Sequence, residues 1–321
     1  MALEIRYDSE GFAPNALVVN GASTLTTTWD DLLWAAITVG RPNRQYVFRH
    51  GLASAYEALF RLSLIRMALE ESGTRTTRLR RTSAARTLDP SEKGAVNYFL
   101  GLAICKLFAA QLLNVPWMLH LDVFRPRLNL VLTGRSRPDL IGEIVGGGWV
   151  ALECKGRLSP PDAGTKVKAK AQAQRVVSVN GTVPSLRIGG IAYFKNDLLQ
   201  FFWRDPEPNP YVRNPIEVEV LPELWRHYYT PILNLIQSNP LLSDRMKREP
   251  TLMPIEHADI QIGIHPAVLR ALGESRWQDA RNIAQSAKSP AENFSYRADG
   301  VVVIAGESWT RPFAETEEQA N

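Results

Sequence analysis

The sequence predicts a mixed α/β fold in which helices flank one central sheet. An apolar helix is expected to begin near Asp89 and to end before Pro116, and a hairpin with a glycine turn is expected between residues 138 and 156. A helix rich in Lys, Ala and Gln should follow at about 165–179, and two strands at 186–194 and 199–203. Alternating helices and strands of this kind are typical of a sheet covered by helices.

The first of these helices has clear signals at its N-terminus. Asp89 or Ser91 can cap it, Pro90 suits its first turn, and Glu92 favours the positive end of the helix dipole. Apolar side chains then cover most of its circumference, so we expect it to be buried against the sheet.

The chain divides into three predicted regions. Residues 1–85 form an N-terminal mixed α/β region that ends in a basic linker, residues 86–206 form the central core, and residues 207–321 form a C-terminal α+β region. The basic linker is interpreted either as a solvated connection or as an arm on a nucleic-acid backbone. Its cations are Arg75, Arg78, Arg80, Arg81 and Arg86.

Composition is that of an ordinary globular protein. The 321 residues are 45% hydrophobic and 22% charged, and the net charge of +4 gives a pI near 9.1, so any phosphate binding must come from local clusters of cations. We find no uninterrupted apolar run of about 20 residues and no signal-peptide layout, so no membrane span is expected. Cys105 and Cys154 have no partner spacing, which indicates a reducing cytoplasm without a disulfide framework.

The predicted hairpin gathers three charges on one face. If Gly147 is the centre of the turn, Asp139 lies opposite Lys155, and Ile141 lies opposite Glu153. Side chains alternate along a strand, so Asp139, Glu153 and Lys155 share a face, with Asp139 diagonal to Glu153. The opposite face is expected to join the core. Its residues are Leu140, Ile144, Val150, Leu152 and Cys154.

This arrangement predicts a metal site for phosphodiester cleavage. The carboxylates of Asp139 and Glu153 and the backbone carbonyl of Cys154 are hard oxygen ligands suited to Mg²⁺, with Mn²⁺ as an alternative ion. Such a metal polarises a phosphoryl group and acidifies a bound water, while Lys155 could orient that water or stabilise growing charge. The competing interpretation is an exposed hairpin in which Lys155 simply pairs with Asp139.

Pro138-Asp139, thirteen intervening residues and Glu153-Cys154-Lys155 together resemble the signature of the PD-(D/E)XK, or restriction-endonuclease-like, nuclease superfamily. The resemblance covers roughly residues 90–205 and implies a core of order α-β-β-β-α-β. It implies that Asp139 and Glu153 bind the metal, that Lys155 is the catalytic lysine, and that Glu92 could add a further acid. Cleavage by such a site would leave a 5′-phosphate and a 3′-hydroxyl.

The helix after Lys155 departs from one subclass of that superfamily. RecB-like members carry Gln followed four residues later by Tyr, whereas here Val176 follows Gln172 and Ser178 follows Gln174. Gln172 or Gln174 could still reach the site. The absence of acids from 163 to 180 favours a phosphate-facing helix, with an ordinary solvated face as the alternative. The predicted nucleic-acid contacts are Lys166, Lys168, Lys170, Arg175, Arg137 and Arg157.

Two further polar residues lie just before the hairpin. His120 and Asp122 alternate along a strand expected at 117–124 and could approach the site. The leading interpretation is a cytoplasmic Mg²⁺-dependent nuclease acting on DNA. Two alternatives are a catalytically silent nuclease-fold module that binds DNA or a protein partner, and a regulated effector of the toxin or anti-phage kind. Cutting both strands would require two sites, which suggests a homodimer.

Overall fold

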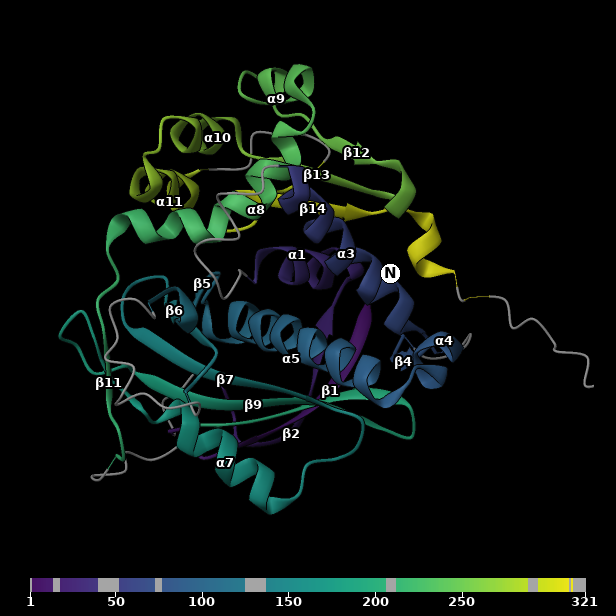
Figure 1. Cartoon of the computed structure of the whole chain (residues 1–321), viewed down its shortest axis with the longest axis vertical. Helices are drawn as coiled ribbons and strands as arrows, with labels where there is room; N and C mark the ends of the chain where they lie inside the picture. The colour runs from purple at the N-terminus through teal and green to yellow at the C-terminus, as the bar shows by residue number, and fades with distance from the viewer. Residues whose placement is uncertain are drawn as a thin grey trace, which may run out of the picture.

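A nine-stranded mixed sheet forms the centre of the computed structural model, which describes residues 2–13, 18–39, 52–72, 77–124, 137–205, 212–287, 294–311 and 313 (Figure 1). The main strand order is β2-β1-β10-β9-β7-β6-β5, with β3 and β4 attached beside β10. The β1/β10 and β7/β9 pairs are parallel and the other pairs are antiparallel. The strands are β1 (Leu3–Glu10), β2 (Gly21–Thr27), β3 (Leu69–Glu71), β4 (Leu79–Arg81), β5 (Trp117–His120), β6 (Leu140–Glu143), β7 (Trp149–Arg157), β9 (Leu186–Lys195) and β10 (Leu198–Arg204). The predicted mixed α/β architecture with one central sheet is therefore confirmed.

Helices cover both faces of this sheet. α5 (Pro90–Leu113) crosses one face and α7 (Ala163–Ala173) lies on the other (Figure 1). The glycines on the strands show how closely the helices approach: a Cβ on Gly156 would lie 1.6 Å from the carbonyl oxygen of Asn97 in α5, and one on Gly189 would lie 2.8 Å from the backbone nitrogen of Lys170 in α7. The sheet is thus the middle layer of the core.

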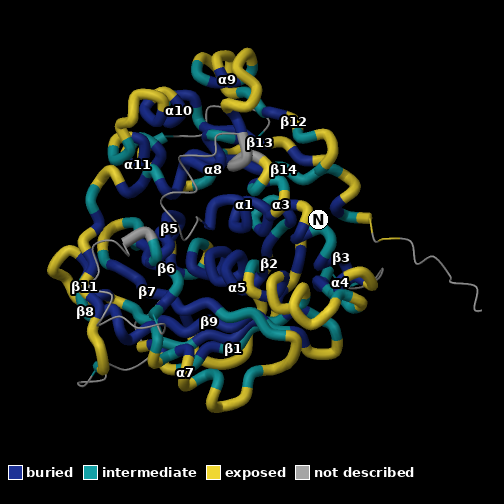
Figure 2. The backbone as a smooth tube through the Cα atoms, in the orientation of Figure 1, coloured by how far each residue is buried: buried dark blue, intermediate teal, exposed yellow. Residues whose placement is uncertain are grey.

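α5 is the central helix, and its N-terminus forms as its sequence predicts. The Asp89 carboxylate accepts hydrogen bonds from the backbone N–H groups of Ser91 and Glu92, and Glu92 Oε2 accepts from Asp89 N at 3.1 Å, which completes a capping box. Asn114 ends the helix in the left-handed conformation. By length and composition α5 could cross a membrane, but 72% of its most apolar window is buried within the protein (Figure 2), as expected of a core helix.

The flanking regions build directly onto this centre. α1 (Trp29–Thr38) and α3 (Leu52–Ala68) pack beside α5, and α8 (Arg226–Gln237) packs beside α1 and α3. Above them lies a second sheet with three short helices (Figure 1). Its elements are β12 (Met253–Ile255), β13 (Ile260–Ile264), β14 (Val301–Ala305), α9 (Pro240–Met246), α10 (Pro266–Gly273) and α11 (Trp277–Ser286).

Three segments differ from the sequence prediction. The strand expected at 117–124 stops at His120, where a 3₁₀ turn begins. The helix expected at 165–179 ends at Ala173, and the β-branched run that follows forms β8 (Val176–Val179), paired with β11 (Ile216–Val218). The basic linker contains strand β4, in which Arg80 pairs with Glu70 at 3.0 Å and Arg81 binds Asp197 at 2.9 Å; Arg75 lies outside the described residues.

Candidate metal centre

The hairpin of β6 and β7 turns one residue earlier than expected. Leu140 pairs with Leu152 and Gly142 with Val150, so the turn is centred on Gly146, and Asp139 lies level with Glu153 instead of Lys155. A shift of two residues in pairing leaves the faces unchanged. The predicted core face is indeed buried, and the two acids are closer than the predicted diagonal placement. The turn glycines 146, 147 and 148 have φ of +99°, +113° and +96°, a region that residues with a Cβ rarely adopt.

Asp139 is fixed at the edge where β6 begins. Its Oδ2 accepts a hydrogen bond from Cys154 N at 2.8 Å, and its backbone N–H donates to Leu152 O at 2.9 Å. Burial raises the pKa of Asp139 to about 6, although the bond from Cys154 and the charge of Lys155 act in the opposite direction. The carboxylate is therefore held in place by the backbone and is half-buried.

Glu153 is the most strongly perturbed acid of the site. Its side chain is only 5% exposed, and Oε1 lies 2.5 Å from Lys155 Nζ. Within the described part of the chain, Oε2 is buried without any hydrogen-bond partner. Burial, followed by the nearby charge of Asp139, raises the pKa of Glu153 to about 8. A buried carboxylate oxygen without a donor requires either a proton or a cation.

Lys155 links Glu153 to the helix on the same face of the sheet. Its Nζ donates to Glu153 Oε1 and, at 2.9 Å, to Gln172 Oε1 on α7. Gln172 therefore reaches Lys155, as the sequence analysis suggested. The ion pair that forms is Lys155 with Glu153 along one strand, whereas the competing interpretation expected Lys155 to pair with Asp139 across the strands.

The residues present fit a hard, partly hydrated cation. In an extended strand the N–H and C=O of one residue point the same way, so the Cys154 carbonyl points to the edge where its N–H meets Asp139. Two carboxylates and one carbonyl suit Mg²⁺, which keeps several waters, better than Zn²⁺, which takes four tight ligands. Among the described residues no group of three or more His, Cys, Asp or Glu side chains could hold a metal.

A second set of residues near Asp139 comes from α5, from the end of β5 and from the segment that connects β5 to β6. Arg137 Nε donates to Asp122 Oδ1 at 2.7 Å, and the charge of Asp122 contributes to the raised pKa of Asp139. His120 and Asp122 therefore approach the site, as the sequence suggested. Tyr98 of α5 lies 3.5 Å from His120 Nε2, and both Asp139 and Arg61 of α3 act electrostatically on Tyr98.

Tyr98 and Arg61 were missed by the sequence analysis. Nothing in the order of residues indicates that α3 and the N-terminal half of α5 meet the hairpin. The available signal was the spacing on α5: Tyr98 lies three residues before Gly101, where a Cβ would lie 2.7 Å from the backbone of Lys155 and Gly156. Positions three apart share a helix face, so a helix that contacts β7 at Gly101 also presents position 98.

Several predicted site residues are placed elsewhere. Glu92 is exposed and completes the capping box of α5. This structural role explains the presence of an acid at position 92 without any contribution to the metal site. Arg175 follows α7 instead of lying on it; it is 7% exposed and donates to Asn214 O at 3.0 Å, so it does not form a phosphate-facing surface. The error arose because the sequence analysis extended α7 too far.

The remaining cations of the predicted nucleic-acid surface differ in their surroundings. Lys166 binds Glu10 at 3.1 Å and lies 3.8 Å above the ring of Phe202, and Arg157 donates to Thr165 Oγ1 at 3.2 Å. Lys168 is exposed, and Lys170 is near enough to Asp205 to oppose the rise of its pKa. Of the cations predicted to bind nucleic acid, Arg137 is the one that acts electrostatically on Asp139.

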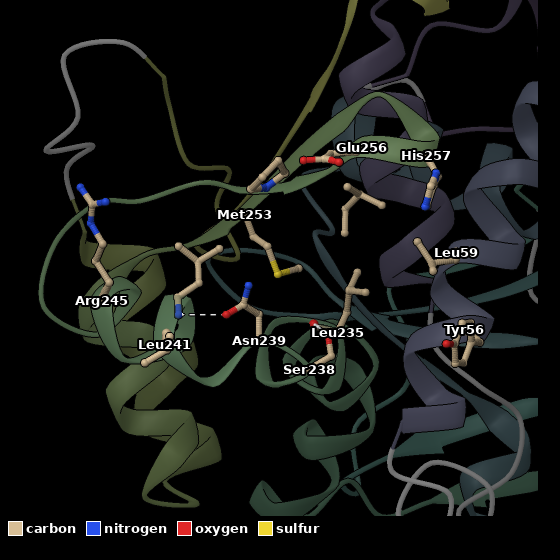
Figure 3. Close-up of a pocket in the computed structure, with 13 residues that line it drawn as sticks. Tyr56, Leu59, Leu235, Ser238, Asn239, Leu241, Arg245, Met253, Glu256 and His257 are labelled. Atoms are coloured by element: carbon tan, nitrogen blue, oxygen red, sulfur yellow. Dashed lines mark hydrogen bonds between the residues drawn. The ribbon is translucent and has the colours of Figure 1, made fainter.

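The comparisons with known proteins add no assignment. Searches of the chain against protein-family models, characterised proteins and solved structures found no match. A surface groove of about 840 Å³ lies apart from the hairpin, between α3, α8, α9 and β12, and its described lining includes Tyr56, Leu241 and His257 (Figure 3). None of the predicted site residues lines it. The assignment of the candidate metal centre therefore rests on the geometry of the hairpin residues.

Proposed function

We propose that the protein is a Mg²⁺-dependent nuclease that hydrolyses phosphodiester bonds, with DNA as its substrate. The observation that carries this proposal is the position of Glu153 Oε2, a buried carboxylate oxygen without a donor, beside a second carboxylate that is held by the backbone. Two such acids, together with a lysine, are the groups that metal-assisted phosphodiester hydrolysis needs.

The order of elements gives further support. α5, β5, β6, β7, α7 and β9 come in this order along the chain, with a 3₁₀ turn after β5 and the short strand β8, which pairs with β11 outside the central sheet, before β9. β7 and β9 are parallel, and the two helices lie on opposite faces of the sheet. This is the α-β-β-β-α-β order that the resemblance to restriction-endonuclease-like nucleases implies. Asp139 directly precedes β6, and Glu153 and Lys155 lie on β7, an arrangement compatible with the roles that the resemblance implies for them.

Each residue of the site then has a definite task. Asp139, Glu153 and the Cys154 carbonyl would hold the metal, which when bound would supply charge stabilisation to the phosphate and lower the pKa of a bound water. Lys155 presents its ammonium beside Glu153, where it stabilises the negative charge that grows on the phosphoryl group. Gln172 orients that ammonium group, because its Oε1 atom accepts a hydrogen bond from Lys155 Nζ. Arg137 adds a positive charge near Asp139.

The decisive experiment is a cleavage panel. Linear, circular and single-stranded DNA and RNA are incubated with the purified chain in Mg²⁺, in Mn²⁺ and in EDTA, and the ends of any product are analysed. We expect cleavage of DNA that depends on the divalent ion and leaves 5′-phosphate ends. The absence of cleavage of every substrate by a folded protein would contradict the proposal.

Variants separate the site from contaminating nucleases. Glu153→Gln and Lys155→Met should each abolish cleavage, while the matched changes Glu307→Gln and Lys247→Met, at exposed positions in the C-terminal region, should leave it intact. Equal activity of all four variants would show that the cleavage does not come from this site.

One observation favours a second candidate, a silent module that binds DNA or a protein partner. Lys155 is already bound by Glu153 and Gln172, and this arrangement would be stable without catalysis. Calorimetric titration with Mg²⁺, with and without a DNA duplex, distinguishes the two. Metal binding supports the nuclease, whereas DNA binding without metal binding or cleavage supports the module.

A further inference from the structure

Tyr98 is the residue through which α5 reaches the candidate centre. Its side chain is 41% exposed, although most of its neighbours on α5 are buried. Burial of the hydroxyl end, followed by the charges of Asp139 and Cys154, raises the pKa of Tyr98 well above its usual value. The phenol therefore keeps its proton, and its neutral O–H group lies beside His120 and near enough to Asp139 to be influenced by its charge.

His120 contacts the Tyr98 hydroxyl. Its imidazole is 5% exposed, and Nε2 lies 3.5 Å from the Tyr98 oxygen. Burial lowers the pKa of His120 to about 4, so the ring is neutral near pH 7 and carries one proton. Contacts of this length are common in enzyme sites before substrate binds, and they shorten in the complex.

The position of that one proton follows from the surroundings of the ring. His120 Nδ1 is buried and has no hydrogen-bond partner among the described residues. A buried N–H without an acceptor is rarer in proteins than a buried acceptor without a donor. The proton therefore resides on Nε2, which donates to the Tyr98 oxygen. The hydroxyl proton of Tyr98 is then free to point into the site.

We propose that Tyr98 donates a hydrogen bond to a non-bridging oxygen of the phosphate that is cleaved beside Asp139, and that His120 positions the Tyr98 hydroxyl. This inference rests on the proposed nuclease function and extends it to a substrate contact from α5. A neutral donor suits this place because the neighbouring Asp139 and Asp122 carboxylates disfavour a phenolate. It also means that α5 contributes a hydroxyl to the site, while the acid Glu92 remains at the helix cap.

The first test compares two tyrosine variants. Tyr98→Phe removes only the hydroxyl, and Tyr56→Phe makes the same change at an exposed position on α3 that lines the separate groove. We expect Tyr98→Phe to lower kcat/KM for DNA roughly ten- to a hundredfold, the range for loss of a hydrogen bond to a charged group, with an unchanged melting temperature. Tyr56→Phe should match the wild type.

The second test identifies the oxygen. An oligonucleotide with one stereodefined phosphorothioate at the measured linkage replaces either non-bridging oxygen by sulfur, which is a poor acceptor. For one of the two isomers we expect the difference between the wild type and Tyr98→Phe to shrink to less than about threefold. A difference that stays the same for both isomers would overturn the contact.

The third test addresses His120. His120→Leu should lower kcat/KM as much as Tyr98→Phe does, and the double variant should be no worse than either single one, since both changes remove the same contact. His120→Gln keeps an N–H near the position of Nε2 and should restore most of the activity. A Gln variant that is as impaired as the Leu variant would overturn the positioning role.

These results also separate the inference from the function on which it rests. If the wild type cleaves no substrate, the proposed function fails and the role of Tyr98 fails with it. If the wild type and Tyr56→Phe cleave, Glu153→Gln does not, and Tyr98→Phe cleaves as fast as the wild type, the nuclease stands and the Tyr98 contact alone is overturned.

Discussion

The carboxyls of Glu153 and Asp139 retain protons at pH values where surface carboxyls are ionised. Burial is the main cause for both. The charge of Asp139 also raises the pKa of Glu153, and the charge of Asp122 also raises the pKa of Asp139, while Lys155 acts in the opposite direction on both acids. Through these two acids the folded protein binds more protons than the unfolded chain between about pH 4.5 and pH 8. The contribution of these two acids to stability therefore falls as pH rises through this window, because the unfolded chain gives up their protons first. His120 acts in the opposite direction below its ordinary pKa, because burial lowers its pKa to about 4.

The first prediction concerns this slope. Without divalent ions, the melting temperature should fall on the order of a few degrees between pH 5 and pH 8. Glu153→Gln cannot ionise and should flatten the fall over the same range, whereas Glu307→Gln at an exposed site should not. Thermal melts in EDTA across this range provide the measurement. A slope that is equal in the wild type and in Glu153→Gln would contradict the assigned environment of Glu153.

A bound cation should replace the proton of this acid pair. We therefore predict that Mg²⁺ at pH 8 raises the melting temperature of the wild type by an amount that grows with the logarithm of Mg²⁺ concentration. The same titration should have little effect on Glu153→Gln. A rise of equal size in both proteins would indicate that Mg²⁺ acts at another place.

At this scale the sequence predicted that the two acids and the lysine share a face and that Gln172 could reach them, but it did not predict the approach of Tyr98 and Arg61. Asp139, Glu153 and Lys155 could be assigned to one face because strand alternation is local and is unaffected by a shift of two residues in pairing. The exact pairing depends on which glycine centres the turn, and three consecutive glycines leave that choice to the surrounding packing. Tyr98 reaches the site only through the packing of α5 on β7, which no local pattern encodes.

Among the elements, α5 and β7 form the closest contact near the site. Gly101 allows α5 to approach the backbone of Lys155 and Gly156, where an added Cβ would lie 2.7 Å from two backbone atoms. Gly94 lies in the same helix, and a Cβ there would meet nothing within 4 Å. The two glycines therefore have opposite effects on stability, although both are helical.

This contrast gives the third prediction. Gly101→Ala should lower the free energy of unfolding by roughly 1–3 kcal/mol, because the added methyl forces α5 away from β7. Gly94→Ala should raise it by about 0.5–1 kcal/mol, since alanine restricts the unfolded chain and favours the helix. Urea unfolding of the two variants beside the wild type is the measurement. Equal effects of both changes would refute the close approach.

The elements also show where sequence patterns stop being informative. The N-terminus of α5 could be predicted because Asp89, Pro90 and Glu92 act within one turn. The end of α7 could not, because the run from Gln172 to Val179 is compatible with a helix until β11 pairs with it from forty residues away. The pairing of β8 with β11 is a long-range event, and it removed Arg175 from the predicted basic face.

Over the whole molecule, the three predicted regions share one core. β1 and β2 of the first region extend the central sheet beside β10, and the side chain of Lys106 in α5 donates to Tyr228 of α8 and to the carbonyl of Thr38 in α1, each at 2.9 Å. The boundary at 85/86 thus runs through shared packing, while the one at 206/207 lies outside the described residues. The site is held by a scaffold drawn from all three regions.

Asp299 is the acid at the centre of this shared packing. It is fully buried; Oδ2 accepts from Trp34 Nε1 at 2.8 Å and from Tyr228 at 2.5 Å, and Oδ1 accepts from Val301 N at 3.0 Å. Burial lowers the pKa of Lys106 well below its usual value, and the charge of Asp299 counteracts this effect. The carboxylate therefore joins α1, α5, α8 and the start of β14.

The last prediction follows from this position. Asp299→Ala should lower the free energy of unfolding by roughly 3–5 kcal/mol, because it removes the carboxylate charge that acts on buried Lys106 and leaves several buried donors without an acceptor. The exposed control Asp244→Ala, which loses only a surface ion pair with Lys247, should cost less than about 1 kcal/mol. Chemical unfolding followed by tryptophan fluorescence measures both. If Asp299→Ala costs no more than the control, the C-terminal region does not stabilise the site-bearing core through this network. We expect Asp299→Ala to cause a large loss of unfolding free energy while unfolding remains a single cooperative transition, because the three regions share one core and unfold together.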